Sequence, residues 1–237
     1  DNNSISGNNI TANNWAGIHL SFWSNNNSIS ANNITNNWAG ILFSRSSNNI
    51  ISGNSFVNNG LRVLKSYGNV VSDNLVNGKP LVYLEGVSDR VVEEAGQVVL
   101  VRCSRIRVEN LNLSSATVGV ELWETSNTEI SGNNITANNY YGIGLDYSSN
   151  NSISGNNITN NECGIRLDHS SNNSVYHNNF VDNARQVFID SPGYPNCWDD
   201  GYPSGGNHWS DYNGTDLFSG PYQNETGSDG IGDTPYI

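Results

Sequence analysis

A ten-residue phrase that recurs at a nearly constant interval is the feature that most constrains the fold of this chain. NNSISGNNIT at residues 2–11 returns as NNSISANNIT at 26–35, and ISGNNIT begins again at Ile130 and at Ile153. Self-similarity with a period in the low twenties is typical of a solenoid, in which each repeat forms one unit stacked on the next. The chain is therefore expected to form an elongated array.

The first apolar residue of each repeat defines a register for the stack. These anchors are Ile5, Ile29, Ile51, Val71, Val92, Val108, Ile130, Ile153 and Val175, with a short step of 16 residues between Val92 and Val108. A second apolar pair, such as Ile143 and Leu145, follows with an outward residue between its members, which is the mark of a half-buried strand. The density of Asn and Gly excludes a helix. The sequence thus predicts an all-β fold, a right-handed parallel β-helix of about nine coils over residues 1–190.

Asparagine recurs at two fixed positions after the anchor. Three residues after it lie Asn8, Asn32, Asn54, Asn74, Asn133, Asn156 and Asn178, and eight residues after it lie Asn13, Asn37, Asn59, Asn138, Asn161 and Asn183. Stacked coils would place the amides of each set one above the other, where they can hydrogen-bond along the solenoid. Asn also tolerates the left-handed backbone of a sharp corner. We interpret both sets as structural ladders.

Two segments depart from the repeat. Residues 79–117 are richer in Val and Leu, with Ala95 and Leu111 at the ladder position, and we expect atypical coils within the same rod. Residues 191–237 are rich in Gly, Pro, Asp and aromatic residues, and we expect a loop-rich cap over the last coil. The first coil shows no comparable cover, so we expect it either to pair with another chain or to follow coils that precede this sequence.

The charge balance limits the partners of the protein. The 237 residues include 10 Lys and Arg against 22 Asp and Glu, a formal charge of −12. Such a surface argues against binding to nucleic acid or to anionic membranes, and no apolar run approaches the roughly 20 residues of a membrane helix. An acidic surface suits calcium, neutral sugars or simple solvation.

Three cysteines are present: Cys103, Cys163 and Cys197. Cys163 and Cys197 could pair if the tail folds back, and free buried thiols are the alternative. There is no CxxC pair, which argues against a zinc site.

Asn-x-Ser/Thr sequons are dense. The candidate glycosylation sites are Asn26, Asn112, Asn150, Asn172, Asn213 and Asn224. This density fits a secreted or cell-surface glycoprotein. The alternative is that the repeat itself generates the sequons, because NNS and NIT are part of it.

The repeat I-S-G-N-N-I-T…N-N-x-x-G-I-x-L resembles the NosD-like parallel β-helix repeat family, which is also grouped with carbohydrate-binding and sugar-hydrolase β-helices. The tail WDDGYPSGGNHWSDY…GPYQNETGSDGIGDTPY resembles the C-terminal segment of archaeal secreted and cell-surface members. The resemblance implies a right-handed β-helix that works outside the membrane. It also implies a copper-related accessory role, but the chain has no Met and its histidines (His19, His169, His177 and His208) are scattered.

Three aspartates share one repeat position. Asp146, Asp168 and Asp190 are each 22 residues apart and directly follow a core residue, so stacking would place neighbours about 4.8 Å apart in one column. Arg166 and His169 flank the column. One interpretation is a catalytic site, in which paired carboxylates act on a glycoside or a carboxylate with Arg166 abstracts a proton. A solvated acidic face and a calcium site are the alternatives.

Aromatic residues recur shortly before the Gly of the long strand, at Trp15, Trp38 and Tyr140. They are expected either to stack on sugar rings or on a neighbouring chain, or to pack at a corner.

Aspartates alternate with Gly in the tail, and Asp199, Asp200, Asp229 and Asp233 are the candidates for a calcium site. Asp229-Gly-Ile-Gly-Asp233 is similar to a short calcium loop, in which Gly permits the turn and carboxylates bind a hard cation. We predict that calcium fastens the cap.

Three functions follow from these patterns. The first is a secreted or cell-surface β-helix with a structural or glycan-binding role, whose partners are glycans or identical subunits stacked end to end into filaments or a surface layer. The second is a polysaccharide lyase or glycoside hydrolase that uses the aspartate column. The third is a periplasmic copper-handling accessory protein. The regularity of the repeat favours the first, without catalysis.

Overall fold

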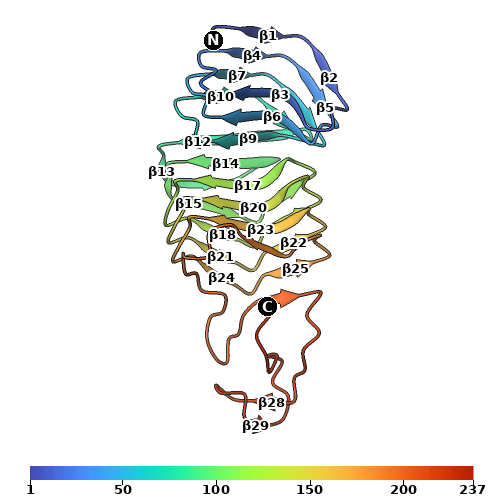
Figure 1. Cartoon of the computed structure of the whole chain (residues 1–237), viewed down its shortest axis with the longest axis vertical. Helices are drawn as coiled ribbons and strands as arrows, with labels where there is room; N and C mark the ends of the chain where they lie inside the picture. The colour runs from blue at the N-terminus through green and yellow to red at the C-terminus, as the bar shows by residue number, and fades with distance from the viewer. Residues whose placement is uncertain (237) are drawn as a thin grey trace.

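The computed structural model describes residues 1–236 of the chain, and these residues form a parallel β-helix (Figure 1). Three short strands make up each coil, and corresponding strands of successive coils pair in parallel. The described residues contain no helix that is long and apolar enough to cross a membrane. The predicted all-β solenoid is confirmed.

The N-terminal half contains four coils. Its first face is β1 (Ser4–Ser6), β4 (Ser28–Ser30), β7 (Ile50–Ser52) and β10 (Val70–Ser72); its second is β2 (Asn9–Thr11), β5 (Asn33–Thr35), β8 (Ser55–Val57) and β11 (Leu75–Val76); its third is β3 (Ala16–Ser21), β6 (Ala39–Ser44) and β9 (Leu61–Leu64). The anchors pair in the predicted register, for example Ile5 with Ile29 and Ile29 with Ile51.

The C-terminal half repeats the three faces. The first is β13 (Ser88–Val92), β15 (Ser104–Glu109), β18 (Glu129–Ser131), β21 (Ser152–Ser154) and β24 (Ser174–Tyr176); the second is β16 (Asn112–Ser114), β19 (Asn134–Thr136), β22 (Asn157–Thr159), β25 (Asn179–Val181) and β27 (His208–Trp209); the third is β12 (Lys79–Glu85), β14 (Gln97–Val101), β17 (Val118–Trp123), β20 (Tyr141–Asp146), β23 (Cys163–Asp168) and β26 (Val187–Ile189). The 16-residue step is real, because Val92 pairs with Val108.

Residues 79–117 form atypical coils, as expected, but only one of the three sheets runs on through this segment, so the stack is interrupted there. The sheets that contain β10 and β9 end there, and a turn at Asn77–Gly78 makes β12 antiparallel to β11. Only the second face of the N-terminal half continues, through β12, into the third face of the C-terminal half. The fourth N-terminal coil, formed by β10 and β11, reverses at this turn and has no third strand. The solenoid therefore has about eight turns rather than nine.

Each half has its own apolar core. One core stacks the inward residues of the C-terminal coils, including Val120, Ile143 and Ile165. The other fills the N-terminal coils and also contains Val99 and Trp123, which point outward from β14 and β17. The end of the N-terminal half therefore packs on the outer face of the C-terminal half.

The corners of the coils explain the small polar residues of the repeat. The backbone is left-handed at matching corners of successive coils, for example at Asn2, Asn26 and Asn48, and Asn and Gly adopt this conformation most readily. The Gly before the long strand has a different role. A Cβ on Gly142 would lie 2.6 Å from the carbonyl oxygen of Gly164, so the coils could not stack as closely.

The asparagine ladders are confirmed. The backbone and side-chain nitrogens of Asn133 both donate to Oδ1 of Asn156, at 3.0 and 2.9 Å, and Asn156 donates in the same way to Asn178. The second ladder repeats this from Asn138 through Asn161 to Asn183. It does not include Asn59, whose buried amide has no partner among the described residues.

A third ladder lies two residues before the anchor, where no ladder is predicted. It runs from Asn3 through Asn27 and Asn49 to Asn69, and again through Asn151, Asn173 and Asn196.

The cap continues the ladders instead of ending them. Asn173 donates to Asn196, and Asn178 donates to Asn207 at 3.1 and 2.9 Å. The cap also adds β27 to the second face, stacks Trp209 on Phe180, and ends in the hairpin of β28 (Phe218–Ser219) and β29 (Glu225–Thr226). The prediction of a cap over the last coil is confirmed.

We predict that Asn156→Ala destabilises the protein by about 3–5 kcal/mol, because it leaves two donors of Asn133 without an acceptor inside the core and removes a donor to the carbonyl of Ile130. Asn157→Ala is the matched control, since the exposed Asn157 makes only a side-chain bond to Asn134, and we expect a change within about 0.5 kcal/mol. Urea unfolding measures both. Equal effects would mean that the ladder is not structural.

Candidate functional site

The three aspartates of the column lie together on the outer face of the C-terminal half. Asp146 pairs with Asp168 in the β20–β23 register, and Asp190 follows β26. Arg166, on β23, binds all three: one guanidinium nitrogen binds Asp146, and another lies 2.6 Å from Asp190 and 3.3 Å from Asp168. The predicted column is present, and its carboxylates share one cation.

The surroundings give the first two carboxyl groups different acidities. Burial raises the pKa of Asp146 despite the bound guanidinium of Arg166. Burial also acts to raise the pKa of Asp168, but hydrogen bonds from Ser191 and His169, together with the charge of Arg166, hold that pKa below its ordinary value. Burial alone would lower the pKa of Arg166, but the charge of Asp146 and the bond to Asp190 raise it, so the guanidinium stays charged.

His169 extends the column toward the solvent. Its Nδ1 lies 2.6 Å from Oδ1 of Asp168 and 3.0 Å from Oγ of Ser191, and its ring stacks on Tyr147 with centroids 4.7 Å apart. Both contacts use the same ring nitrogen, so the geometry is not that of a nucleophilic serine triad, in which the hydroxyl and the carboxylate meet opposite nitrogens.

Beside this column, side chains replace a missing strand. The edge of β9 meets three outward polar residues of the C-terminal half: Thr117 accepts from the Gly60 amide at 2.8 Å, Gln97 accepts from Leu61 at 2.9 Å, and Glu121 accepts from Val63 at 3.2 and 3.3 Å. Every buried backbone donor needs an acceptor, so these contacts fix how the halves meet.

Glu121 and Arg62 are buried at this junction. Burial raises the pKa of Glu121 to about 8, although the charge of Arg62 acts to lower it. The Arg62 guanidinium lies 4.2 Å above the ring of Tyr140 and 5.0 Å from that of Tyr141. Its Nη1 is buried and has no hydrogen-bond partner in the part of the chain that the structure describes.

A groove of about 500 Å³ opens between the two halves, above these residues. The N-terminal half contributes a corner column of Phe22, Arg45 and Lys65, and the opposite wall carries Trp123, Tyr140, Asp146, Tyr147, Arg166 and Asp168. The groove thus combines aromatic rings with charged groups of both signs. It is the candidate functional site.

Sequence reasoning misses the N-terminal wall of the groove. Phe22, Arg45 and Lys65 occupy one repeat position, the left-handed corner after the third strand, so alignment of the repeats could have grouped them. No pattern in the sequence shows that this corner faces the aspartates of coils much later in the chain.

The predicted aromatic column is divided between the halves. Trp15 packs edge-on against His19, with centroids 4.7 Å apart, and is 53% exposed. Trp38 instead meets Tyr140 at 4.5 Å, across the junction. Tyr140 also stacks on Tyr141. Tyr140 therefore lies at the groove, while Trp15 and Trp38 do not line it.

The candidate calcium ligands accept hydrogen bonds within the tail. Asp233 accepts from the amides of Leu217 and Phe218, Asp229 from that of Ile231, Asp199 from that of Gly201, and Asp200 from the hydroxyl of Ser204. Within residues 1–236, they do not gather into a group of three or more metal-binding side chains. A calcium site in the cap stays a prediction.

All six candidate glycosylation residues are exposed: Asn26, Asn112, Asn150, Asn172, Asn213 and Asn224. Their modification stays a prediction. Cys163 is buried and Cys197 exposed, and the two do not pair, so the disulfide alternative is not supported.

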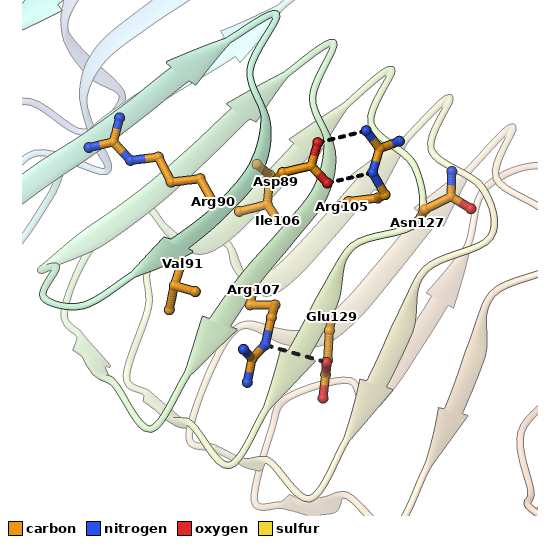
Figure 2. A pocket seen from close by; sticks show the side chains of 8 residues that line it. All are labelled: Asp89, Arg90, Val91, Arg105, Ile106, Arg107, Asn127 and Glu129. Carbon is orange, nitrogen blue, oxygen red and sulfur yellow. Dashed lines mark hydrogen bonds and ion pairs between the residues drawn. The ribbon is translucent and has the colours of Figure 1, made fainter.

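A second hollow, of about 400 Å³, lies on the outer face of β13 and β15 (Figure 2). Most of its charges pair: Asp89 binds Arg105 at 2.6 and 2.7 Å, and Arg107 reaches Glu129 at 3.9 Å, while Arg90 forms no ion pair with a described residue. These side chains are largely exposed, and no aromatic ring lines the hollow. It is a solvated charged face.

Comparison with known proteins identifies the family. The family described as periplasmic copper-binding protein (NosD) matches residues 59–214, and the family described as right handed beta helix region matches residues 1–91. The first match covers more than half of the chain, so the protein belongs to the NosD family. The predicted family and right-handed β-helix are confirmed.

Several solved structures are similar. They are the periplasmic alginate epimerase AlgG (20% identity, TM-score 0.39, covering 70% of this chain and 39% of that one), the A-module of mannuronan C-5 epimerase AlgE6 from Azotobacter vinelandii (13%, 0.33, 76% and 61%) and a GH136 lacto-N-biosidase from Eubacterium ramulus (11%, 0.32, 86% and 45%). The chain spans less than two thirds of each. No curated protein matches.

The residues of this chain do not fit a copper site. Copper binds thioether, thiolate and imidazole groups. The sequence has no Met, and no group of three or more His, Cys, Asp or Glu among the described residues could hold a metal ion. The buried thiols of Cys103 and Cys163 donate to carbonyl oxygens, and burial raises the pKa of both.

We expect the free energy of unfolding of the unmodified protein to decrease between about pH 5 and pH 8, and we predict that Glu121→Gln removes this decrease. The raised pKa means that the native state binds more protons than the unfolded chain in this window, so the free energy of unfolding decreases as the pH rises. Gln keeps the shape and does not titrate. The two proteins should be similar near pH 5, and the variant more stable above pH 8, in urea titrations. Parallel profiles would show that Glu121 titrates in its ordinary range.

Proposed function

We propose that this protein binds glycans in the groove between its two halves, and that it works outside the cytoplasm. The supporting observation is a set of exposed aromatic rings at the groove. Phe22 lines it and is 78% exposed, and its neighbour Trp23 is 71% exposed. Both residues have left-handed backbones, with φ of 50° and 70°. Arg45 and Lys65 have the same left-handed backbone at the equivalent corner of the next two coils, so the conformation belongs to the repeated turn, which presents the two rings to solvent.

The groove has the composition that sugars require. Aromatic faces stack on the apolar faces of sugar rings, and charged or amide groups bind the hydroxyls. Tyr147, which is 40% exposed and stacks on His169, lines the same groove as Phe22, and Asp168 also lines it. The membership in a family described as periplasmic supports a location in the periplasm or outside the cell.

A role as polysaccharide lyase or glycoside hydrolase is the second candidate, supported by Asp168, whose low pKa and position beside His169 suit a base or nucleophile. Hydrolysis also requires a protonated partner carboxyl that reaches the substrate. The carboxyl with the raised pKa, Asp146, is only 3% exposed and is bound by Arg166. This geometry favours binding without turnover.

We rank end-to-end stacking of copies of this protein below glycan binding as a proposal. At the C-terminal end, the cap already pairs with β25 through β27 and bridges β24 at Cys197. Among the three strands of the last described coil (β24, β25 and β26), only β26 has an outer edge that the cap does not pair with. A second copy would therefore have to displace the cap to continue all three faces.

We predict that a glycan array with the purified protein gives binding, and that Phe22→Ala and Tyr147→Ala each weaken it about tenfold by removing a stacking face. Tyr222→Ala is the control, because Tyr222 is 84% exposed but belongs to the cap. The bound glycan should be recovered intact. Turnover that Asp168→Asn abolishes would make the protein an enzyme, and absence of any glycan binding would contradict the proposal.

A further inference from the structure

The cations of the N-terminal wall have no acidic partners. Arg45, Arg62 and Lys65 form no ion pair with any described residue. The same is true of Lys79, Arg90 and Arg185, but those three do not line the groove, whereas Arg45, Arg62 and Lys65 come together in it. Lys65 contacts only an aromatic ring, with Nζ 5.5 Å from the centroid of Tyr147. Three unpaired positive charges thus line one groove of a protein with a formal charge of −12.

Arg62 is the most constrained of the three. Its residue is only 5% exposed, yet Nη1 has no acceptor within the described chain. A buried charged donor without an acceptor destabilises a fold, so it is retained where a ligand or solvent completes it. The rings of Tyr140 and Tyr141 hold the guanidinium in place, which leaves its orientation set before a ligand arrives.

The carboxylates of the groove do not compensate these charges. Arg166, on the opposite wall, already binds Asp146, Asp168 and Asp190, and Asp168 also accepts from Ser191, so these carboxylates are engaged there and form no ion pair with the three cations. Glu121, the remaining carboxyl near Arg62, binds the Val63 amide and has a pKa of about 8, so it is largely protonated at neutral pH. The groove therefore carries positive charge on its N-terminal wall.

We propose that the ligand of the groove is an anionic glycan, and that Arg45, Arg62 and Lys65 bind the carboxylate or sulfate groups of its sugars. This inference rests on the proposed function and specifies its ligand class. A guanidinium presents parallel N–H donors that match the two oxygens of such a group. The sugar ring then lies over Tyr147 and Phe22, which form the apolar part of the same groove.

The net charge of the protein sets the expected salt dependence. An acidic surface repels a polyanion over most of its area, so attraction is confined to this groove. Bonds to Arg45 and Lys65, which are exposed, weaken as salt rises, whereas the contact with the buried Arg62 is screened less. We expect binding of anionic oligosaccharides to decrease moderately between low and high salt, and binding of neutral ones to stay constant.

Calorimetric titration with three oligosaccharides of equal length tests the inference: an oligouronate, a sulfated oligosaccharide and a neutral one. The double variant Arg45→Gln/Lys65→Gln should lose at least tenfold in affinity for the anionic ligands and keep its affinity for the neutral one. Arg107→Gln, which removes a surface arginine paired with Glu109 and Glu129, should change none of them. The comparison of the two anionic ligands shows which acid group the groove prefers.

Arg62→Gln tests the buried member, with circular dichroism as a check that the variant folds. If it unfolds, the exposed double variant still decides the question. Equal affinity for the neutral and anionic ligands, unaffected by the double variant, would overturn the inference and leave glycan binding intact. Absence of binding to all three oligosaccharides and to the glycan array would overturn both.

Discussion

The structure depends on how the edge of β9 is satisfied. A parallel sheet that ends inside a protein leaves a row of backbone donors without partners, and burying them unpaired is unfavourable. Here Thr117, Gln97 and Glu121 accept those donors with side-chain oxygens in place of a strand. These residues must point outward from the C-terminal half. The same face therefore carries Val99 and Trp123, which complete the N-terminal core.

The groove is a consequence of this packing and belongs to neither half alone. Because the N-terminal half ends against an outer face, its corner column comes to lie beside the aspartate column. Each half then contributes a different chemistry. The C-terminal face supplies carboxylates that share Arg166, and the N-terminal half supplies the exposed ring of Phe22 and cations that form no ion pair with the described residues. A continuous rod would hold these groups on separate coils, far apart along its axis.

The spacing of the repeat could predict the features that recur in every coil. The junction between the two halves occurs only once, so the spacing could not predict it. Anchors such as Ile29, the ladder at Asn156 and the column of Asp146 and Asp168 all follow from the spacing, because stacked coils bring equivalent positions together. The reversal after β11 occurs once, at Asn77–Gly78, and the loss of Asn in the following segment shows only that it is atypical. The role of Arg62 depends on that reversal, so no repeat pattern indicates it.

Hydrogen exchange of individual amides tests the junction most directly. If side chains replace a strand at the edge of β9, the amides of Leu61 and Val63 should exchange as slowly as that of Ile143, which lies in the middle of a sheet. Exchange as fast as in the exposed loops of the cap would mean that the two halves do not pack as described. The groove between them would then have no fixed walls.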